Sequence, residues 1–435
     1  MNGGMRGVGD PSTTTDGDVV LNRWIGTQAV NLRRHVESLR PFGYTEFGTG
    51  SAAPSRAHID AVNRFVGDFR TKLTDGSAWL DAAVSQATRA PSQSNRAVVL
   101  ARKDVLAGRV LYVEGIWDFY FDLFVQRLSA FGQRLRAIDR IAANLYEDVY
   151  LGLSASRPAP TLLPFSYSSS GFSPFTFRRG VPLRRLRHHQ NLFPLVIIPQ
   201  HRLDAVWALS SVLHEVAHNL QADLGLWAVM PRLVFERLTT AGRLPSEVAI
   251  IWARWHKEIC ADLLALLLGG TAVVESLMDV VGRSREGTVR YSEGAVHPTP
   301  VLRVPISLVL LRRLGFKDLA GSLSSAWSSL YPAPFGGGIP SRVLDTFQCA
   351  ADLVVDTMVF RRHPQLGGKA LAELVEFGPN QMALIELGAK RLGSGEDLGT
   401  IPPRLMVSAA RTALDERLAT PQEITDHFYR SLGRR

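Results

Sequence analysis

The sequence contains little cysteine and little lysine, and each shortage narrows the class of protein. Only two cysteines, Cys260 and Cys349, occur among 435 residues, which excludes the disulfide framework of small secreted domains. Only six of the 49 basic residues are lysine, so the formal net charge of +9 comes mainly from arginine. Because this charge is spread along the chain and forms no single block, it does not favour nucleic-acid binding.

Long apolar runs are also missing. The most apolar stretch, residues 263–278, is too short to span a bilayer and is bounded by charges at Asp262 and Glu275, so it predicts a buried helix. The N-terminal residues are polar and rich in glycine, without the apolar centre of a secretion signal. We therefore expect a cytoplasmic protein with no membrane span.

Composition and periodicity divide the chain into five segments. Residues 1–17 are interpreted as a disordered tail. Helical patterns fill residues 18–153 and again residues 331–435. Between these two regions lie a Ser/Pro/aromatic loop with a basic segment, 154–189, and a segment that carries the candidate chemistry, 190–330. No internal repeat is visible.

Apolar periodicity predicts helices over most of the chain. In residues 110–153, apolar side chains recur at steps of three and four, as one buried face of a helix requires. A second long helix is indicated over about 246–281. Residues 192–200 form a short β-branched run between prolines, which predicts a strand at the edge of a sheet. The expected fold class is therefore mainly α, of the α+β type, with a small β-sheet.

The loop at residues 154–180 has no period, because serine, proline and glycine interrupt it. Its five aromatic side chains nevertheless argue against a plain linker. We expect either a mobile flap or an ordered loop packed on the segment that follows. The adjoining basic run, residues 178–189, is interpreted as a solvated or acid-pairing face.

The pentapeptide HEVAH, residues 214–218, is the main candidate for chemistry. On a helix starting near Asp204, His214 and His218 lie one turn apart on the same face, where two imidazoles can bind one Zn²⁺. Glu215 is offset around the helix and can act as general base on a water molecule. Taken alone, the pentapeptide is also compatible with a pair of hydrogen-bonded helix histidines that bind no metal.

A catalytic zinc site needs a third protein ligand and one open position. Glu258 is the candidate, because burying an unpaired carboxylate in so apolar a helix would be costly without a nearby cation. Asp262 follows four residues later on the same face, where it can accept a hydrogen bond from the imidazole of His214. Small side chains at Ala261 and Ala265 permit close approach of the two helices. Rival third ligands are Asp223, Glu236 and Glu247.

In chain order, HEVAH, EICAD and HPTPVLR resemble the HExxH…ExxAD…HP…R series of the gluzincin zinc metallopeptidases, closest to the Ste24 and HtpX type. The resemblance covers about residues 205–303 and implies a zincin-like catalytic core within 190–330. The implied roles are zinc ligation by His214, His218 and Glu258, general base catalysis by Glu215, support of an imidazole by Asp262, and oxyanion stabilisation or support of the site by His297 and Arg303.

The chain departs from the patterns of related peptidases in three respects. It lacks the transmembrane helices of the Ste24 and HtpX type, which puts membrane-protein substrates in doubt. It lacks the GxMEN box of gluzincin aminopeptidases, which favours an endopeptidase. Gln221 and Leu224 stand where the metzincin series has glycine and histidine, which excludes that class.

The segment HPTPVLR is weaker evidence for the same metallopeptidase interpretation. Pro298 and Pro300 restrict the backbone and so fix the direction of the preceding His297. A hydrogen-bond donor near the metal is what a tetrahedral intermediate requires. Tyr291 is an alternative donor.

Two functional hypotheses follow. The first is a zinc-dependent peptidase, with Zn²⁺ as cofactor and a peptide or protein as substrate. The alternative is a catalytically inactive, zinc-stabilised helical protein that serves as a binding or scaffold protein. A fourth metal position open to water favours the enzyme, whereas a position filled by a side chain favours the scaffold. The sequence does not indicate the substrate or the oligomeric state.

Overall fold

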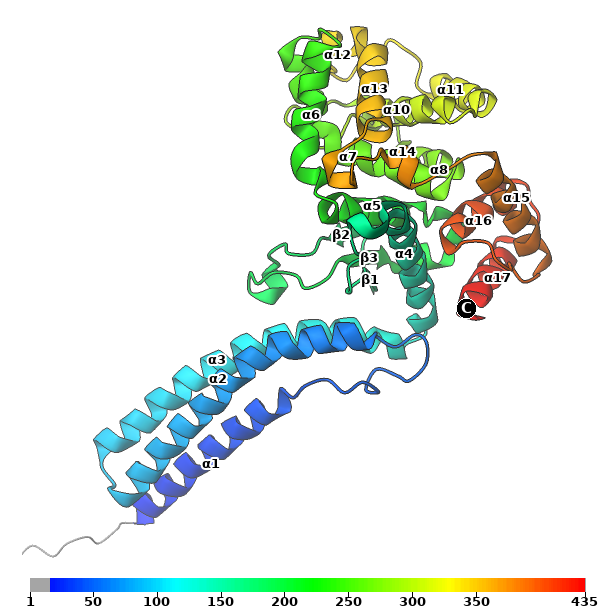
Figure 1. The fold of residues 1–435 in the computed structure, drawn as a ribbon. Helices are drawn as coiled ribbons and strands as arrows, with labels where there is room; N and C mark the ends of the chain where they lie inside the picture. Colours follow the sequence, from blue (N-terminus) through cyan, green and yellow to red (C-terminus); the bar gives the residue numbers. More distant parts are fainter. Residues whose placement is uncertain (1–15, 435) are drawn as a thin grey trace, which may run out of the picture. The chain divides into compact units, whose positions relative to one another are not determined.

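Helices make up most of residues 16–434, the part of the chain that the computed structural model describes (Figure 1). The mainly α fold with a small sheet is therefore confirmed. The expected tail at residues 1–17 lies outside the described part except for its last two positions, which begin the first helix. The chain divides into two units, described separately below. Unit 1 comprises residues 16–49, 54–125 and 182–189, and unit 2 comprises residues 50–53, 126–181 and 190–434.

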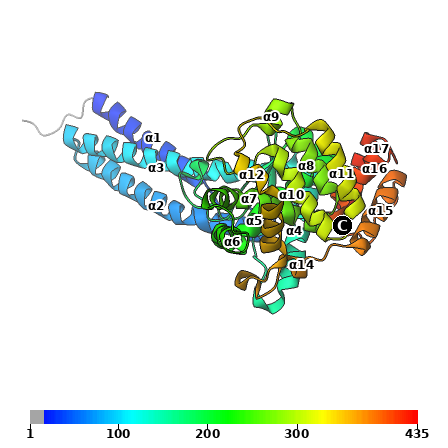
Figure 2. The same ribbon diagram turned by 90° about the horizontal axis from the view of Figure 1, so that it is seen from above.

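Unit 1 is built on three long helices that run side by side (Figure 2). They are α1 (Asp16–Ser38), α2 (Arg56–Arg89) and α3 (Gln93–Val125). The side chain of Ser55 caps α2 by accepting a hydrogen bond from the backbone N–H of His58. Apolar side chains spaced three and four residues apart on each helix meet in a shared core that includes Leu32, Leu73 and Val110.

The basic run of the sequence lies mainly in unit 1, where residues 182–189 pack against α3. Arg185 pairs with Asp122 at 2.8 Å, and the hydroxyl of Tyr112 lies 2.9 Å from Nε2 of His189. The predicted acid-pairing role is confirmed for Arg185.

Unit 2 contains the other helices and all strands of the described residues. The strands are β1 (Phe165–Ser169), β2 (Phe175–Phe177) and β3 (Leu195–Pro199). The helices up to residue 313 are α4 (Gly132–Leu153), α5 (Ser210–Asp223), α6 (Leu226–Thr240), α7 (Ser246–Gly269), α8 (Ala272–Val281), α9 (Arg285–Val289) and α10 (Pro300–Arg313). The remaining helices are α11 (Lys317–Leu330), α12 (Ser341–Asp345), α13 (Phe347–Val355), α14 (Leu371–Leu374), α15 (Pro379–Ser394), α16 (Met406–Asp415) and α17 (Pro421–Arg434).

The sheet has the order β1-β3-β2, with β3 parallel to β1 and antiparallel to β2. The expectation that the 192–200 strand lies at a sheet edge is therefore wrong, because β3 is the central strand and all five of its residues are buried. The prolines that suggested an edge lie at the limits of the ladder, where Pro199 ends the strand. The 154–180 segment supplies both outer strands of the sheet.

Helix α4 is tied to the sheet by one carboxylate. Asp139 accepts hydrogen bonds from the backbone N–H and the hydroxyl of Ser166 on β1, at 2.8 and 2.7 Å. Helix α5 packs against both β2 and β3. The sheet therefore links α4 to the helix that carries HEVAH.

Three helix boundaries differ from the sequence-based expectation. The apolar pattern over 110–153 spans two helices, because α3 ends at Val125 and α4 starts at Gly132, where a Cβ would lie 2.2 Å from the carbonyl oxygen of Arg127. The expected long helix 246–281 is broken at Gly270, whose φ of +93° favours glycine. The segment after Asp204 forms 3₁₀ turns, and α5 begins only at Ser210.

One hydrophobic core runs through unit 2 from Leu135 on α4 to Leu432 on α17. Residues of the C-terminal region also donate hydrogen bonds to the backbone at the end of α7. The hydroxyl of Ser408 donates to the carbonyl oxygen of Gly269 at 2.5 Å, and the guanidinium of Arg404 donates to that of Leu268. These carbonyls belong to the last turn of α7 and have no partner within that helix. Residues 331–434 therefore share their core with the segment that carries the motifs.

No helix within residues 16–434 combines the length and the apolar character needed to cross a membrane.

The close contact of α5 and α7 at Gly269 generates a stability prediction. A Cβ at this position would lie 2.2 Å from Cδ2 of Leu213, which is fully buried. Gly269→Ala should therefore lower the free energy of unfolding by about 1–3 kcal/mol, measured by chemical denaturation. Gly321→Ala on α11 is the control, because a Cβ there meets nothing within 4 Å, and it should leave stability unchanged or raise it. Equal effects of the two substitutions would contradict the described packing.

Candidate metal centre

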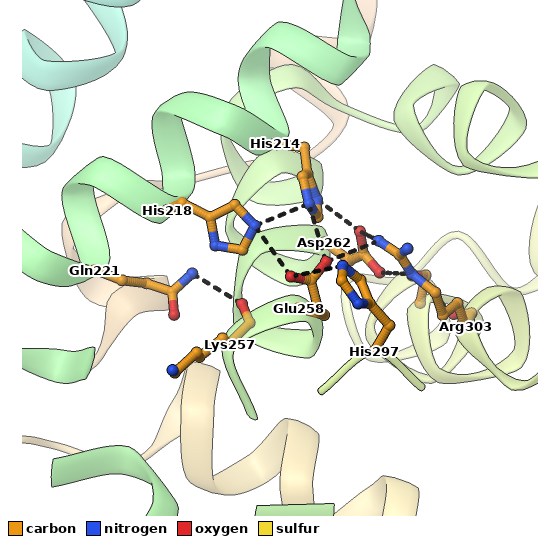
Figure 3. Close-up of polar contacts among 9 residues, drawn as sticks. His214, His218, Gln221, Lys257, Glu258, Asp262, His297 and Arg303 are labelled. Carbon is orange, nitrogen blue, oxygen red and sulfur yellow. Dashed lines mark hydrogen bonds and ion pairs between the residues drawn. The ribbon is translucent and has the colours of Figure 1, made fainter. Parts of the chain in front are cut away.

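Helices α5 and α7 lie against one another and bring the two sequence motifs together (Figure 3). The fully buried residues of these two helices include small side chains at Ala217 on α5 and at Ala261 and Ala265 on α7. The side-chain amide of Gln221 donates to the backbone carbonyl oxygen of Lys257 at 3.0 Å, which joins the two helices directly. Side chains at four-residue steps on α5 therefore face side chains at four-residue steps on α7 across a short distance.

Three side chains converge at this contact. Nε2 of His214 lies 3.1 Å from Nε2 of His218. The Glu258 carboxylate lies 3.4 Å from the first of these nitrogens through Oε2, and 3.5 Å from the second through Oε1. These are the three residues whose ligand atoms all lie within 4.8 Å of one another. The structure thus brings together the three residues that the sequence predicts as metal ligands.

The spacing of these atoms fits a zinc ion. Ligand atoms bound tetrahedrally at about 2.0–2.1 Å from Zn²⁺ lie about 3.3 Å from one another. The observed separations of 3.1, 3.4 and 3.5 Å are close to that value, the last two being made by different oxygens of the Glu258 carboxylate. Two imidazoles and one carboxylate are also a donor set that zinc accepts. The residues present therefore fit the ion that the motif implies.

A buried acid–base pair supports the first histidine. Oδ1 of Asp262 lies 2.8 Å from Nδ1 of His214, so Nδ1–H donates to the carboxylate and Nε2 faces the cluster. Arg303 holds Asp262 with two hydrogen bonds, of 2.9 Å from Nε and 2.8 Å from Nη2. The same guanidinium lies 3.7 Å from Glu258. The predicted support of His214 by Asp262 matches this contact, and Arg303 contacts the cluster mainly through Asp262.

The pKa values show how strongly the groups interact. Burial acts to lower the pKa of His214, but the hydrogen bonds to Asp262 and Glu258 outweigh it and raise the pKa to about 10. Burial and the charge on His214 lower the pKa of His218 to about 3. Burial acts to raise the pKa of Glu258, but its contacts with His214 lower it to about 2. Without a cation, one proton is thus held on His214, and a bound metal ion would take over its role.

Glu215 lies beside the cluster with its carboxylate unpaired. It is half-buried, and its side chain makes no hydrogen bond or ion pair with another residue of the described chain. Burial raises its pKa to about 7. A carboxyl group with a pKa in this range can both accept and return a proton near neutral pH.

His297 approaches the cluster from the segment that precedes α10. Its Nε2 lies 3.3 Å from Oε1 of Glu258, and its side chain is 62% exposed. It does not join the three ligands, because within the described residues the group of convergent ligand atoms contains only the two α5 histidines and Glu258.

Other predicted candidates lie elsewhere. Tyr291 packs against the core of unit 2 and does not line the cavity at the cluster. The three rival ligands are all engaged with other residues. Asp223 accepts a hydrogen bond from Tyr146, Glu236 pairs with Arg232, and Glu247 pairs with Arg342.

The ligands open onto a cavity of about 480 Å³, which we call the metal-site cavity. Its lining includes Glu215, His297, Trp227, and Phe175 and Thr176 of strand β2. The side-chain amide of Asn219 donates to the hydroxyl of Thr176 at 2.7 Å and so joins α5 to β2. No sequence pattern pointed to Thr176, whereas Asn219 and Gln221 could have been noted as polar residues in a buried helix.

Comparison of the chain with models of protein families, with curated proteins and with solved structures finds no match.

Zinc binding can be tested directly by titration of metal-free protein in a calorimeter. We expect one zinc ion per chain, and we expect His218→Ala and Glu258→Gln each to remove a ligand and abolish tight binding. Asp262→Asn should weaken binding by about 10–100-fold, because it removes the charged acceptor of the His214 N–H. His201→Ala, an exposed histidine outside the cluster, is the control and should bind as the wild type does. Undiminished affinity in Glu258→Gln would rule out this ligand set.

Proposed function

We propose that the chain is a zinc-dependent peptidase, and specifically an endopeptidase of the gluzincin type. One observation carries the proposal: the imidazoles of His214 and His218 and the carboxylate of Glu258 converge at the wall of an open cavity. A closed structural zinc site would need a fourth protein ligand. Within the described residues no fourth histidine, cysteine, aspartate or glutamate joins the three. This favours the enzyme over the inactive scaffold.

When bound, Zn²⁺ would polarise the scissile carbonyl group and make water a stronger nucleophile near neutral pH. Glu215 lines the same cavity, and the absence of a competing partner in residues 16–434 leaves its carboxylate available. Its Oε atoms can accept the proton of the attacking water and then deliver it to the nitrogen of the leaving amine.

Two further groups would act on the substrate or on the ligands. His297 is largely exposed and lines the cavity, so its imidazole can donate a hydrogen bond to the oxygen that becomes negative during attack. Arg303 is a positioning residue in this scheme, because its two bonds to Asp262 fix the carboxylate that orients His214.

The substrate backbone has a natural partner in β2. This strand pairs with β3 on one side only, and Phe175 and Thr176 line the cavity. An extended peptide could add to its open edge as a further strand and so pass the metal site. The sequence-based hypothesis gave this role to the 192–200 strand, but β3 is paired on both sides.

The mechanism predicts that metal binding and turnover can be separated. Glu215→Gln retains the shape of the side chain and all three ligands, so zinc affinity should stay within about threefold of the wild type. Turnover of a quenched fluorescent peptide should fall by at least about 10²-fold, because the proton acceptor is lost. Glu286→Gln, an exposed carboxylate outside the cavity, serves as a matched control. A Glu215→Gln enzyme that cleaves at the wild-type rate would refute the proposed mechanism.

A further inference from the structure

Three arginines line the metal-site cavity without a carboxylate partner. They are Arg178, which follows β2, Arg202 in the 3₁₀ turn before α5, and Arg283 after α8. In the described part of the chain, no aspartate or glutamate oxygen lies within ion-pair distance of any of them, although many other arginines of unit 2 are paired. The cavity therefore presents cationic groups that the protein itself does not neutralise.

The carboxylates of the cavity do not offset these charges. Glu258 is engaged by the two imidazoles, and Asp262 is engaged by His214 and Arg303. Glu215 remains, and a bound zinc ion would add two further positive charges beside it. The loaded cavity would thus carry a positive potential, which low-dielectric walls focus on an approaching substrate.

Arg178 is held in place by an aromatic ring. Its guanidinium lies 3.7 Å from the centroid of the Trp227 ring, and Nζ of Lys257 lies 4.3 Å from the same centroid. Two cations therefore share one ring, and their like charges repel. Arg178 is half-buried, so part of its hydration is lost as well. An anion bound beside the pair would relieve both costs.

Arg202 has one donor atom that lacks a partner. Its Nε is buried and has no hydrogen-bond partner within the described residues. A buried donor without an acceptor is destabilising, and a guanidinium matches a carboxylate in shape and charge. This side chain is therefore suited to a carboxylate that enters the cavity.

Arg283 stands where the metal-site cavity meets a second one. The adjoining cavity has a volume of about 320 Å³ and shares Val280, Arg283, His297 and Arg303 with the first. No carboxylate residue belongs to its lining. A peptide that extends from the metal site into this space would meet Arg283 directly.

We propose, building on the peptidase function proposed above, that the enzyme selects peptides with carboxylate groups on either side of the scissile bond. These carboxylate groups belong to Asp and Glu side chains of the substrate peptide. Arg178, Arg202 and Arg283 are the specificity-determining residues. They come from three separate segments of the lining, after β2, before α5 and after α8, which suits several acidic positions on one extended chain more than a single terminal carboxylate.

The test uses the full-length, zinc-loaded protein and quenched peptides of identical length with acetylated and amidated ends. One series carries Glu around the cleavage site, and the matched series carries Gln. We expect kcat/KM to be higher for the Glu series, mainly through a lower KM, and the difference to shrink with added salt. A third series, with Gln side chains and a free C-terminus, separates side-chain recognition from recognition of the terminal carboxylate.

Three variants and one control assign the effect. Arg178→Gln, Arg202→Gln and Arg283→Gln should each lower the Glu-to-Gln ratio of kcat/KM by about three- to tenfold, as expected for one partly desolvated ion pair. Arg312→Gln is the matched control, because Arg312 is exposed and does not line the cavity. It should leave the ratio unchanged. Circular dichroism and zinc affinity identify any variant that is misfolded.

The outcomes separate the two proposals. Equal cleavage of the Glu and Gln series would overturn the specificity and leave the peptidase intact. A preference seen only with the free C-terminus would overturn the assignment to side chains. If no peptide is cleaved, the peptidase proposal fails. Fluorescence anisotropy of labelled Glu and Gln peptides with the zinc-loaded protein then tests whether the cavity recognises acidic side chains. Tighter binding of the Glu peptides that is lost in the three variants would support it, and equal binding would refute it.

Discussion

The packing of α5 against α7 brings two imidazoles opposite a carboxylate, and the other features of the site depend on it. The helices pack closely at Gly269, where a Cβ would meet Leu213, and Gln221 ties them together. Burial of Glu258 among apolar neighbours would be unfavourable without compensating positive charge. The cluster supplies that charge through His214 when metal-free, and a bound cation would supply it when loaded. The groups that stabilise the buried carboxylate are therefore the same groups that would hold a cation.

The parts that sequence could predict are those that depend on local spacing. Residues four apart on a helix share a face wherever the helix lies, so HEVAH and the pair Glu258 and Asp262 indicated two functional faces. Their pairing rested on chemistry, because a buried carboxylate needs a partner and an imidazole ligand needs an acceptor. The contacts of Asp262 with His214 and Arg303 agree with that reasoning.

The parts that sequence missed depend on contacts between distant segments. Strand β2 has only three residues, too few to show a period, and it forms because β3 provides a ladder for it. For the same reason Thr176 and Arg178 could not be placed in the cavity. Gly270 breaks an apolar pattern that continues on both sides, since α7 and α8 are both largely buried. Tyr291 was suggested by its residue type alone, which carries no information on direction.

The most direct test is a crystal structure of the protein with zinc, with anomalous data collected on both sides of the zinc absorption edge. The account predicts one anomalous peak about 2.0–2.2 Å from Nε2 of His214, Nε2 of His218 and a carboxylate oxygen of Glu258, with a further position open to the cavity. No peak at this point, or a peak whose fourth ligand is another protein side chain, would contradict the central claim.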